Sequence, residues 1–339
     1  MADWLAQLPA PPADKYGWPW TNAAPALSPL MPNGQPWPRI TVITPSYHQG
    51  RYLEETLRSV LLQNYPNLEY FVIDGGSEDE SRSIMQRYAP WLSDWVSEKD
   101  NGQAHAINKG LQRATGEILN WINSDDLLMP GALAEIALSF VETQAEAVAA
   151  ACINFGQGPE KIITNENLTV AGLLVFHPAT TYHQPAVWLR RPLLLECGGI
   201  DEHYHYVFDW EMTLRYLSQF PKVHYLSNAV ARFRLHAESK TTARAERFEA
   251  EHFELWRKFS RTLPSPTLRT LCDHQLRRKK WLKLLNEFER DQESFRLYRA
   301  AKLSYLACLD PAMRFTRMTA GAIRRHLLNQ YAQRDLSVI

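Results

Sequence analysis

Between residues 39 and 130 the chain alternates short apolar runs with segments of helical periodicity, and this alternation restricts its fold more than any other feature. Apolar, β-branched and aromatic runs typical of strands occupy residues 39–44, 68–73, 95–97 and 117–122. Apolar residues recur at helical spacing in residues 52–63, 81–88 and 103–112, and a further helix is expected after Pro130. This pattern predicts an α/β fold with a mostly parallel sheet flanked by helices.

A polar cluster follows each of the three main strands. The clusters are Thr44-Pro45-Ser46-Tyr47, Asp74-Gly75-Gly76-Ser77 and Asn123-Ser124-Asp125-Asp126. Sheets of this kind bind their ligands beyond the carboxyl ends of the strands. We therefore predict that the three clusters open onto one crevice.

The third cluster places two acids, Asp125 and Asp126, directly after an apolar strand. Adjacent carboxylates repel each other, and a divalent cation bound between them and a phosphate would relieve that repulsion. Mg²⁺ or Mn²⁺ is the expected ion, because hard cations prefer oxygen ligands. The alternative is an N-cap on the helix expected after Pro130. The cluster by itself leaves both interpretations open.

Three more residues are candidates for chemistry, each with a structural alternative. Asp74 can accept a hydrogen bond from a base or a ribose, or it can cap an ordinary strand-to-helix turn. Asp209 precedes a helical pattern, where it can act as a general base or interact with the helix dipole. His236 follows a strand that carries arginines, so it can bind diphosphate or a metal, or be structural.

The chain divides into three segments by composition. Residues 1–38 form a Pro-rich arm, which repeated prolines keep from regular helix or interior strand, so that it either packs by its aromatic residues or stays partly loose. Residues 39–244 form the α/β catalytic domain, and residues 245–339 form a helical C-terminal extension. We find no secretory signal and no apolar run long enough to span a bilayer. The four cysteines lack CxxC spacing, which predicts no zinc site and fits a reducing cytoplasm.

Charge is unevenly distributed along a chain of zero formal net charge. Residues 245–339 carry 19 Lys+Arg against 11 Asp+Glu, a net of +8, so the preceding residues carry −8. The basic run Arg277-Arg278-Lys279-Lys280 lies in this extension. Its helices can dock on an anionic membrane, or they can cover the catalytic domain or form a dimer contact. We expect the covering or dimer role.

The motifs, taken in order, resemble those of the inverting family-2 glycosyltransferases, which have the GT-A nucleotide-binding fold. The resemblance covers about residues 38–241 and rests on the shared order and spacing of its motifs. The matching stretches are residues 43–47, 54–63, 72–79, 100–103, 106–110, 114–117, 123–126 with Pro130, 198–202, and 209–211 with Arg215.

The resemblance implies a set of residues that bind the nucleotide-sugar donor. This set comprises Pro45, Tyr47, Asp74, Asp100, Lys109, Asn123, Ser124 and His236. In the family, the first two positions pack around the base, the third reads it, and the late histidine closes over the diphosphate. Asp125 matches the metal ligand, Asp126 is a neighbouring ligand with a less certain role, and Asp209 matches the catalytic base.

Two positions depart from the family pattern. Asn123 replaces the usual first aspartate of the metal motif, which removes a charge beside the metal. Gly75 replaces the second of two aspartates that many relatives have. Neither change removes a residue on which the implied mechanism depends.

The implied reaction is transfer of a sugar from a nucleotide-sugar donor to an acceptor hydroxyl, with inversion of configuration, in polysaccharide or glycan biosynthesis. The expected cofactors are Mn²⁺ or Mg²⁺ and a UDP-, dTDP- or GDP-sugar. We expect a glycan or lipid-linked acceptor, no nucleic acid, and a cytoplasmic location with possible contact at the inner membrane face. The alternatives are a nucleotidyltransferase, which would usually have a Gly-rich loop after the first strand, and a non-catalytic sugar- or partner-binding relative.

Overall fold

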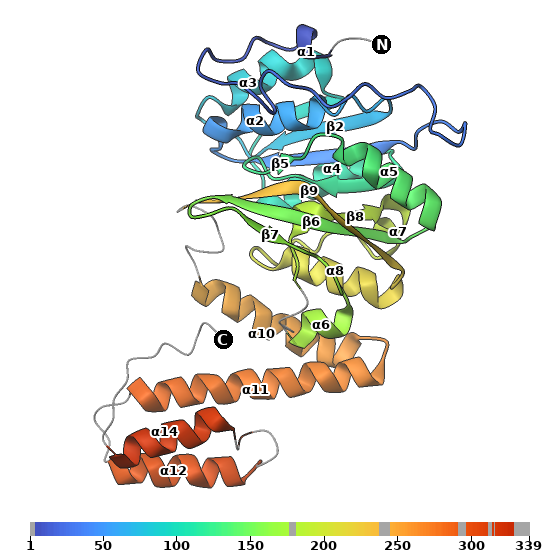
Figure 1. The fold of residues 1–339 in the computed structure, drawn as a ribbon. Coiled ribbons are helices and arrows are strands. Elements are labelled where there is room, and N and C mark those ends of the chain that lie inside the picture. Colours follow the sequence, from blue (N-terminus) through green and yellow to red (C-terminus); the bar gives the residue numbers. More distant parts are fainter. Residues whose placement is uncertain are drawn as a thin grey trace. The chain divides into compact units, whose positions relative to one another are not determined.

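The computed structural model describes residues 4–175, 181–236, 245–290, 296–310, 314 and 316–328 (Figure 1). The chain forms two compact units, Met1–His252 and Phe253–Ile339. The division falls within helix α10 (Ala245–Thr262).

The first unit is built around one mixed sheet. Its strands are β1 (Ile40–Ser46), β2 (Leu68–Asp74), β3 (Asp94–Ser97), β4 (Ile118–Trp121), β5 (Leu127–Leu128), β6 (Ala147–Gly156), β7 (Lys161–Ile163), β8 (Val187–Arg190) and β9 (Val223–Leu235). Their spatial order is β3-β2-β1-β4-β8-β6-β9-β5, and β7 pairs with β6. The alternating pattern predicted from the sequence is confirmed for the first four strands.

Half of this sheet is parallel, as predicted, and half is not. Strands β3, β2, β1 and β4 pair in parallel, with Ile40 opposite both Leu68 and Ile118. Strand β8 then runs antiparallel between β4 and β6, whereas β6 and β9 pair in parallel. The sheet is therefore mixed rather than mostly parallel. The sequence did not predict this, because the hydrophobic pattern of a short strand does not indicate whether it runs parallel or antiparallel to its neighbour.

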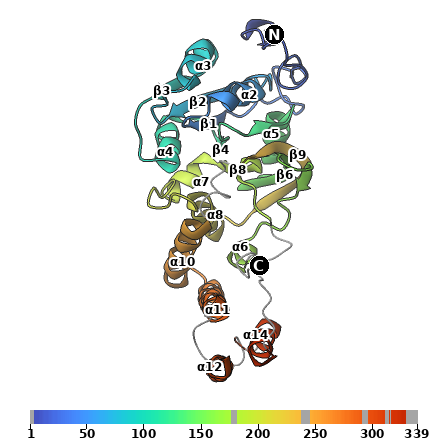
Figure 2. The same cartoon turned by 90° about the vertical axis from the view of Figure 1, so that its left-hand side faces the viewer.

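Helices cover both faces of the sheet. Those of the first unit are α1 (Trp4–Gln7), α2 (Gly50–Leu61), α3 (Ser81–Tyr88), α4 (Gln103–Arg113), α5 (Ala132–Thr143), α6 (Val170–Val175), α7 (Arg191–Glu196) and α8 (Phe208–Gln219), with 3₁₀ turns at Ala89–Trp91 and Gln184–Ala186. Figure 2 shows α2 and α4 on opposite sides of the sheet. The chain lays β1, β2 and β3 side by side in one direction and then returns to place β4 on the other side of β1.

This reversal makes the boundary between β1 and β4 a switch point, where open α/β sheets bind ligands. The polar clusters after β1 and β4 lie on either side of it. Close packing of α4 against β1 depends on Gly110, because a Cβ there would lie 2.7 Å from Cγ2 of Ile43. The core beneath the switch point is apolar and includes Val42, Val72 and Ile118, each fully buried.

The Pro-rich arm is packed against α2 rather than loose, and the sequence had left both arrangements open. Arg58 of α2 is completely buried, and its guanidinium donates hydrogen bonds to the carbonyls of Pro9 (2.8 Å), Pro19 (3.0 Å) and Trp20 (2.6 Å). It also lies over the Trp20 ring, 5.5 Å from its centroid. Trp18 Nε1 donates to the carbonyl of Leu128 at 2.9 Å. The described part of the arm thus belongs to the first unit.

The second unit contains α11 (Pro266–Arg290), α12 (Arg296–Cys308), α14 (Arg317–Leu328) and the end of α10. Its helices enclose a small core of Trp281, Leu285, Leu303, Ala307 and Ala322. Among the described residues, no helix is long and apolar enough to cross a membrane.

Candidate functional site

The loop after β4 carries the acids singled out in the sequence, and it is not a helix cap. Asp125 and Asp126 are followed by the short strand β5, and α5 begins only at Ala132. The residue before that helix is Gly131, whose φ of 81° is left-handed. The N-cap alternative is therefore wrong for Asp125 and Asp126, because a strand separates them from the helix.

This loop is fastened from two neighbouring helices. Thr56 Oγ1 of α2 lies 2.9 Å and 2.8 Å from the carbonyl oxygens of Ser124 and Asp126. Gln103, the first residue of α4, donates from Nε2 to Asn123 Oδ1 at 2.6 Å. Ser124 itself is buried. Helices α2 and α4 thus both hold the loop that carries Asp125 and Asp126.

Asp126 points inward and serves as an acceptor for the loop. It is 1% exposed, and it accepts hydrogen bonds from the backbone N–H of Arg234 (3.0 Å) and from Asn123 Nδ2 (3.1 Å). Burial and the charge of Asp125 raise the pKa of Asp126 well above its ordinary value. Asn123 thus links α4 to this carboxyl group, because its Oδ1 accepts from Gln103 and its Nδ2 donates to Asp126.

Asp125 lies closer to the surface and pairs with a residue from the far end of β9. Its Oδ2 lies 2.8 Å from Nε2 of His236, and the two side chains are 21% and 9% exposed. Arg234 supports the pair, since its Nε donates to the Asp125 carbonyl at 2.8 Å. Its guanidinium also forms a salt bridge with Glu55 at 2.7 Å.

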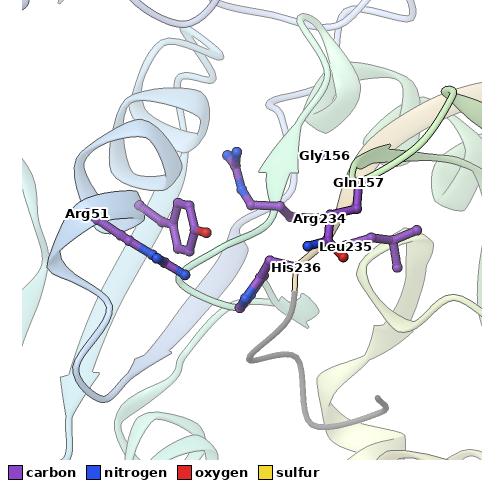
Figure 3. Close-up of a pocket in the computed structure, with 7 residues that line it drawn as sticks. Arg51, Gly156, Gln157, Arg234, Leu235 and His236 are labelled. Atoms are coloured by element: carbon purple, nitrogen blue, oxygen red, sulfur yellow. The ribbon is translucent and has the colours of Figure 1, made fainter. Parts of the chain in front are cut away.

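A pocket of about 360 Å³ opens beside this pair at the ends of β6 and β9. It is lined by Arg51, Tyr52, Gly156, Gln157, Arg234, Leu235 and His236. Figure 3 shows Arg51 reaching toward the pocket from α2, opposite Arg234 and His236. Two guanidinium groups and an imidazole in one small pocket favour an anionic ligand.

The arginines of this pocket contact two aromatic rings. The guanidinium carbons of Arg51 and Arg234 lie 4.3 Å and 4.6 Å from the centroid of the Tyr52 ring. Those of Arg234 and Arg232 lie 4.4 Å and 4.3 Å from the centroid of the Phe155 ring. Such contacts hold the planar guanidinium groups in fixed orientations.

Asp74, at the end of β2, holds its own turn together. It is 0% exposed, and its carboxylate accepts from the backbone N–H of Gly76 (3.1 Å) and Ser77 (2.8 Å) and from the hydroxyls of Ser77 (2.6 Å) and Ser97 (2.8 Å). With both oxygens engaged, Asp74 offers no exposed surface to a base in this structure. These contacts are those expected of a residue that caps a strand-to-helix turn, which was the structural alternative for Asp74.

Gly75 brings two other donor-site candidates together. A Cβ on Gly75 would lie 3.1 Å from Cδ2 of Tyr47 and 3.2 Å from Oδ2 of Asp100. Tyr47 is 61% exposed, and Asp100 is partly exposed, with its other oxygen accepting from the N–H of Gly102 at 2.8 Å. The missing side chain at position 75 is thus what allows this ring and this carboxylate to approach.

Two predicted donor-site residues have mainly local contacts. Pro45 is buried within β1, opposite Ile73 of β2. Lys109 of α4 forms a salt bridge with Glu98, with Nζ 2.8 Å from Oε1. Its side chain is 18% exposed, whereas that of Glu98 is 59% exposed.

Of the two acids in the first turn of α8, Asp209 is the accessible one. Asp209 is partly exposed, and its Oδ1 accepts from the N–H of Trp210 at 2.8 Å. Glu211 is completely buried and forms two hydrogen bonds with the guanidinium of Arg215, at 3.0 Å and 2.8 Å. Arg215 also donates to the carbonyl of Gly199 at 2.8 Å, which ties α8 to the turn before it.

These contacts connect the three clusters along one edge of the sheet. They run from Tyr47 through Gly75 to Asp100 and the start of α4, and from there to Asn123 and Asp126. Asp125, next to Asp126 in the chain, then pairs with His236. Among the described residues, no group of three His, Cys, Asp or Glu side chains gathers as a ready metal site. The edge suits a ligand that brings its own oxygen atoms, such as a diphosphate.

Several members of this arrangement were not predicted from the sequence. Tyr52 and Phe155 gave no signal as site residues, because their importance comes from what they contact, and Gln103 was visible only as the last residue of the matching stretch 100–103. Arg234 was visible only as part of an arginine-bearing strand. The alternation Arg232-Phe233-Arg234 was the available clue, since residues two apart share one face of a strand.

Comparison with known proteins finds similarity to glycosyltransferases. Residues 41–199 match the sequence model of the family described as "Glycosyl transferase family 2". An uncharacterized glycosyltransferase of Rickettsia prowazekii is 21% identical over 240 residues, which cover 67% of this chain and 73% of that protein. A putative teichuronic acid biosynthesis glycosyltransferase of Bacillus subtilis, TuaG, is 39% identical over 93 residues, which cover 26% of this chain and 36% of that protein.

Two solved structures share the fold. TarS of S. aureus (residues 1–349), in complex with UDP-GlcNAc, superposes with a TM-score of 0.61 at 16% identity, covering 88% of this chain and 94% of that one. The mannosyltransferase PcManGT of Pyrobaculum calidifontis, in complex with GDP-Man and Mn²⁺, superposes with a TM-score of 0.55 at 22% identity, covering 86% and 88%.

Proposed function

We propose that this chain, whose residues 41–199 match the model of glycosyltransferase family 2, transfers a sugar from a nucleotide-sugar donor to an acceptor hydroxyl with inversion at the anomeric carbon. The observation that carries this proposal is the connected edge from Tyr47 to Asp125 and His236, together with the accessible Asp209. Complexes of the two similar structures with UDP-GlcNAc and GDP-Man support a nucleotide-sugar donor. The similarity to TuaG supports a place in polysaccharide biosynthesis.

Asp125 and His236 fit two neighbouring positions around a divalent cation. Their facing atoms are 2.8 Å apart, and neighbouring ligands of an octahedral ion with bonds of about 2.1 Å are about 3 Å apart. The remaining ligands would come from the donor phosphates and water. When bound, Mn²⁺ or Mg²⁺ would neutralise charge on the departing nucleoside diphosphate. The Mn²⁺ in the PcManGT complex supports this choice.

Asp126 has a supporting role in this proposal. Its buried carboxyl group fixes Asn123 and the backbone of Arg234, and through them the positions of Asp125 and His236. Ligands of metals depend on such outer contacts for their orientation. The pocket beside the pair, with Arg51 and Arg234, would hold negative charge from the donor phosphates.

The base end of the donor would lie against the exposed ring of Tyr47. Asp100, which Gly75 allows to lie beside that ring, is the carboxylate placed to accept hydrogen bonds from the base or ribose. Asp74 would not contact the donor; it would hold the turn that carries Gly75 and Gly76 in place through its hydrogen bonds to that turn. Pro45 and Lys109 would contribute through strand packing and through the contact between α4 and Glu98.

Asp209 would remove the proton from the acceptor hydroxyl as that oxygen attacks the anomeric carbon. The bond to the diphosphate oxygen breaks on the opposite face, so the configuration inverts. Glu211 cannot take this role, because it is completely buried in its ion pair with Arg215. Its contribution is to anchor the helix that carries Asp209.

A donor screen followed by one substitution tests the proposal. The full chain is incubated with a panel of nucleotide sugars and Mn²⁺, and release of nucleoside diphosphate is measured. Asp209→Asn should lower transfer by about 10³-fold while nucleoside diphosphate still binds. Asp14→Asn, at an exposed position of the arm, is the control. Near wild-type turnover by Asp209→Asn would contradict the assignment of the base.

The second unit supports a proposal about location. Helix α12 and the residue after it expose Leu297 (64%), Tyr298 (58%), Tyr305 (64%) and Leu309 (59%), with Lys302 also exposed on that helix. Residues 245–339 carry a net charge of +8. An apolar, tyrosine-bearing surface within a basic segment matches the chemistry of an anionic lipid surface. We therefore favour peripheral membrane contact over the covering or dimer role expected from the sequence.

A further inference from the structure

Three successive backbone N–H groups ahead of α8 converge on one carboxylate from α10. Glu251 Oε2 accepts hydrogen bonds from the N–H groups of Tyr206 (2.7 Å) and Val207 (3.1 Å). Both oxygens of Glu251 lie 3.1 Å from the N atom of His205. Successive N–H groups that point the same way form a concave site for an anion. Here the chain itself supplies that anion, from 44 to 46 residues away.

The three N–H groups lie directly before Asp209 in the chain. Val207 is the residue that precedes α8, and no side chain of its own segment caps that helix. Since N–H groups at and before a helix start need an acceptor, Glu251 supplies the one that the local sequence lacks. It therefore fixes where α8 begins, and with it the direction in which its first turn presents Asp209.

A second contact locks the same two segments. Trp210, next to Asp209, meets the ring of His252, next to Glu251, with centroids 5.7 Å apart and planes at 68°. The ring of Trp210 also meets that of Tyr182, with centroids 5.5 Å apart. Glu251 and His252 of α10 thus contact the chain on both sides of Asp209, at residues 205–207 before it and at Trp210 after it.

The loop of residues 205–207, which Glu251 contacts, lies beside residues of the proposed donor site. A Cβ on Gly102, at the start of α4, would lie 3.6 Å from His205 Nδ1. Asp100 accepts the hydrogen bond of that same glycine at 2.8 Å. Loop 205–207 therefore lies beside the turn that carries Asp100, and it leads in the chain to Asp209.

We infer that Glu251 is a positioning residue for Asp209, so that the catalytic site depends on a helix beyond the family-matched residues 41–199. This inference rests on the proposed function. Without the carboxylate, the three N–H groups would turn toward water and the first turn of α8 would lose its orientation. Donor binding, which uses the edge from Tyr47 to His236, would remain.

The test compares Glu251→Ala, Glu251→Gln and the control Glu249→Ala, an exposed residue on the same helix. Transfer kcat, donor KM and the affinity for nucleoside diphosphate with Mn²⁺ are measured on the full chain. Glu251→Ala should lower kcat by about 10²-fold, because misplacement by about 1 Å has this effect, while diphosphate affinity stays within about twofold. Glu251→Gln keeps an oxygen acceptor and should recover part of kcat.

Two outcomes would overturn the inference. One is a Glu251→Ala kcat equal to that of Glu249→Ala. The other is an equal loss of kcat and diphosphate affinity in both Glu251 variants, which would indicate general destabilisation rather than positioning. Asp209→Asn, measured in parallel, distinguishes a failure of the proposed base from a failure of the positioning role. If that variant is active, the proposed base is wrong; if it is inactive and Glu251→Ala matches the control, only the positioning role fails.

Discussion

His236 Nε2 lies 2.8 Å from Asp125 Oδ2, which joins the end of β9 to the loop after β4 across 111 residues of sequence. In the proposed metal site, both side chains would exchange their mutual hydrogen bond for bonds to a cation. Arg234 joins the end of β9 to this loop twice, because its backbone N–H donates to the Asp126 carboxyl group and its Nε donates to the Asp125 carbonyl.

Removing either member of that pair should remove metal-dependent donor binding. We expect Asp125→Ala and His236→Ala each to weaken the binding of nucleoside diphosphate in the presence of Mn²⁺ by at least about tenfold. Binding without Mn²⁺ should change little. Calorimetry with and without the metal measures both quantities, and His224→Gln on the same strand is the control. Equal Mn²⁺ enhancement in wild type and variants would count against the pair as ligands.

Introducing an acid at position 75 should weaken donor binding. An aspartate at Gly75 would crowd Tyr47 and bring a like charge next to Asp100, whose Oδ2 lies 3.2 Å from the new Cβ. We expect Gly75→Asp to raise the donor KM by about tenfold, equivalent to about 1.4 kcal/mol. Gly75→Ala, which adds bulk without charge, should have the smaller effect. If both variants bind donor as tightly as wild type, Asp100 and Tyr47 do not form the base site.

The buried Arg58 should be important for stability rather than catalysis. Replacing it with leucine leaves the carbonyls of Pro9, Pro19 and Trp20 without their donor. We expect Arg58→Leu to lower the free energy of unfolding by roughly 3 kcal/mol and to expose the arm to proteases. Arg82→Leu, at an exposed position of α3, should change it little. Urea denaturation measures the difference, and equal stability of the two variants would refute the role of the arm.

His183 should make folding sensitive to acid. Burial lowers the pKa of His183 to about 4, whereas an unfolded histidine titrates near 6.5. The unfolded chain therefore binds a proton that the folded chain resists, and stability falls as the pH drops from about 6.5 to about 4, by up to about 1.4 kcal/mol per pH unit. His183→Phe should flatten that part of the stability profile. A profile identical to wild type would show that other groups dominate.

Membrane contact can be tested by flotation with vesicles that contain anionic lipid. The full chain should float with these vesicles but not with neutral ones, and less at high salt. Replacing Tyr298 and Tyr305 with serine should reduce flotation, because their exposed rings form part of the apolar surface of α12. Vesicle-independent dimerisation that the same substitutions abolish would instead assign this surface to a second copy of the chain.

Much of the fold could be predicted because its signals are local. The first three main strands and the helices between them carry clear periodicity, and the structure places them within a few residues of the predicted bounds. The family match confirms the choice of sugar transfer over nucleotidyl transfer. Strand directions beyond β4 could not be predicted, because a short buried run has the same pattern whether its neighbour is parallel or antiparallel.

The sequence by itself determined the order of strands and helices, the polar cluster after each strand and the carboxylates available for chemistry. Only the tertiary structure decided that Asp126 and Glu211 are buried while Asp125 and Asp209 are accessible. It also decided that Glu251 caps the loop before Asp209. The physical reason is that periodicity records how a residue sits within its own element, whereas burial and pairing depend on which distant elements pack against it.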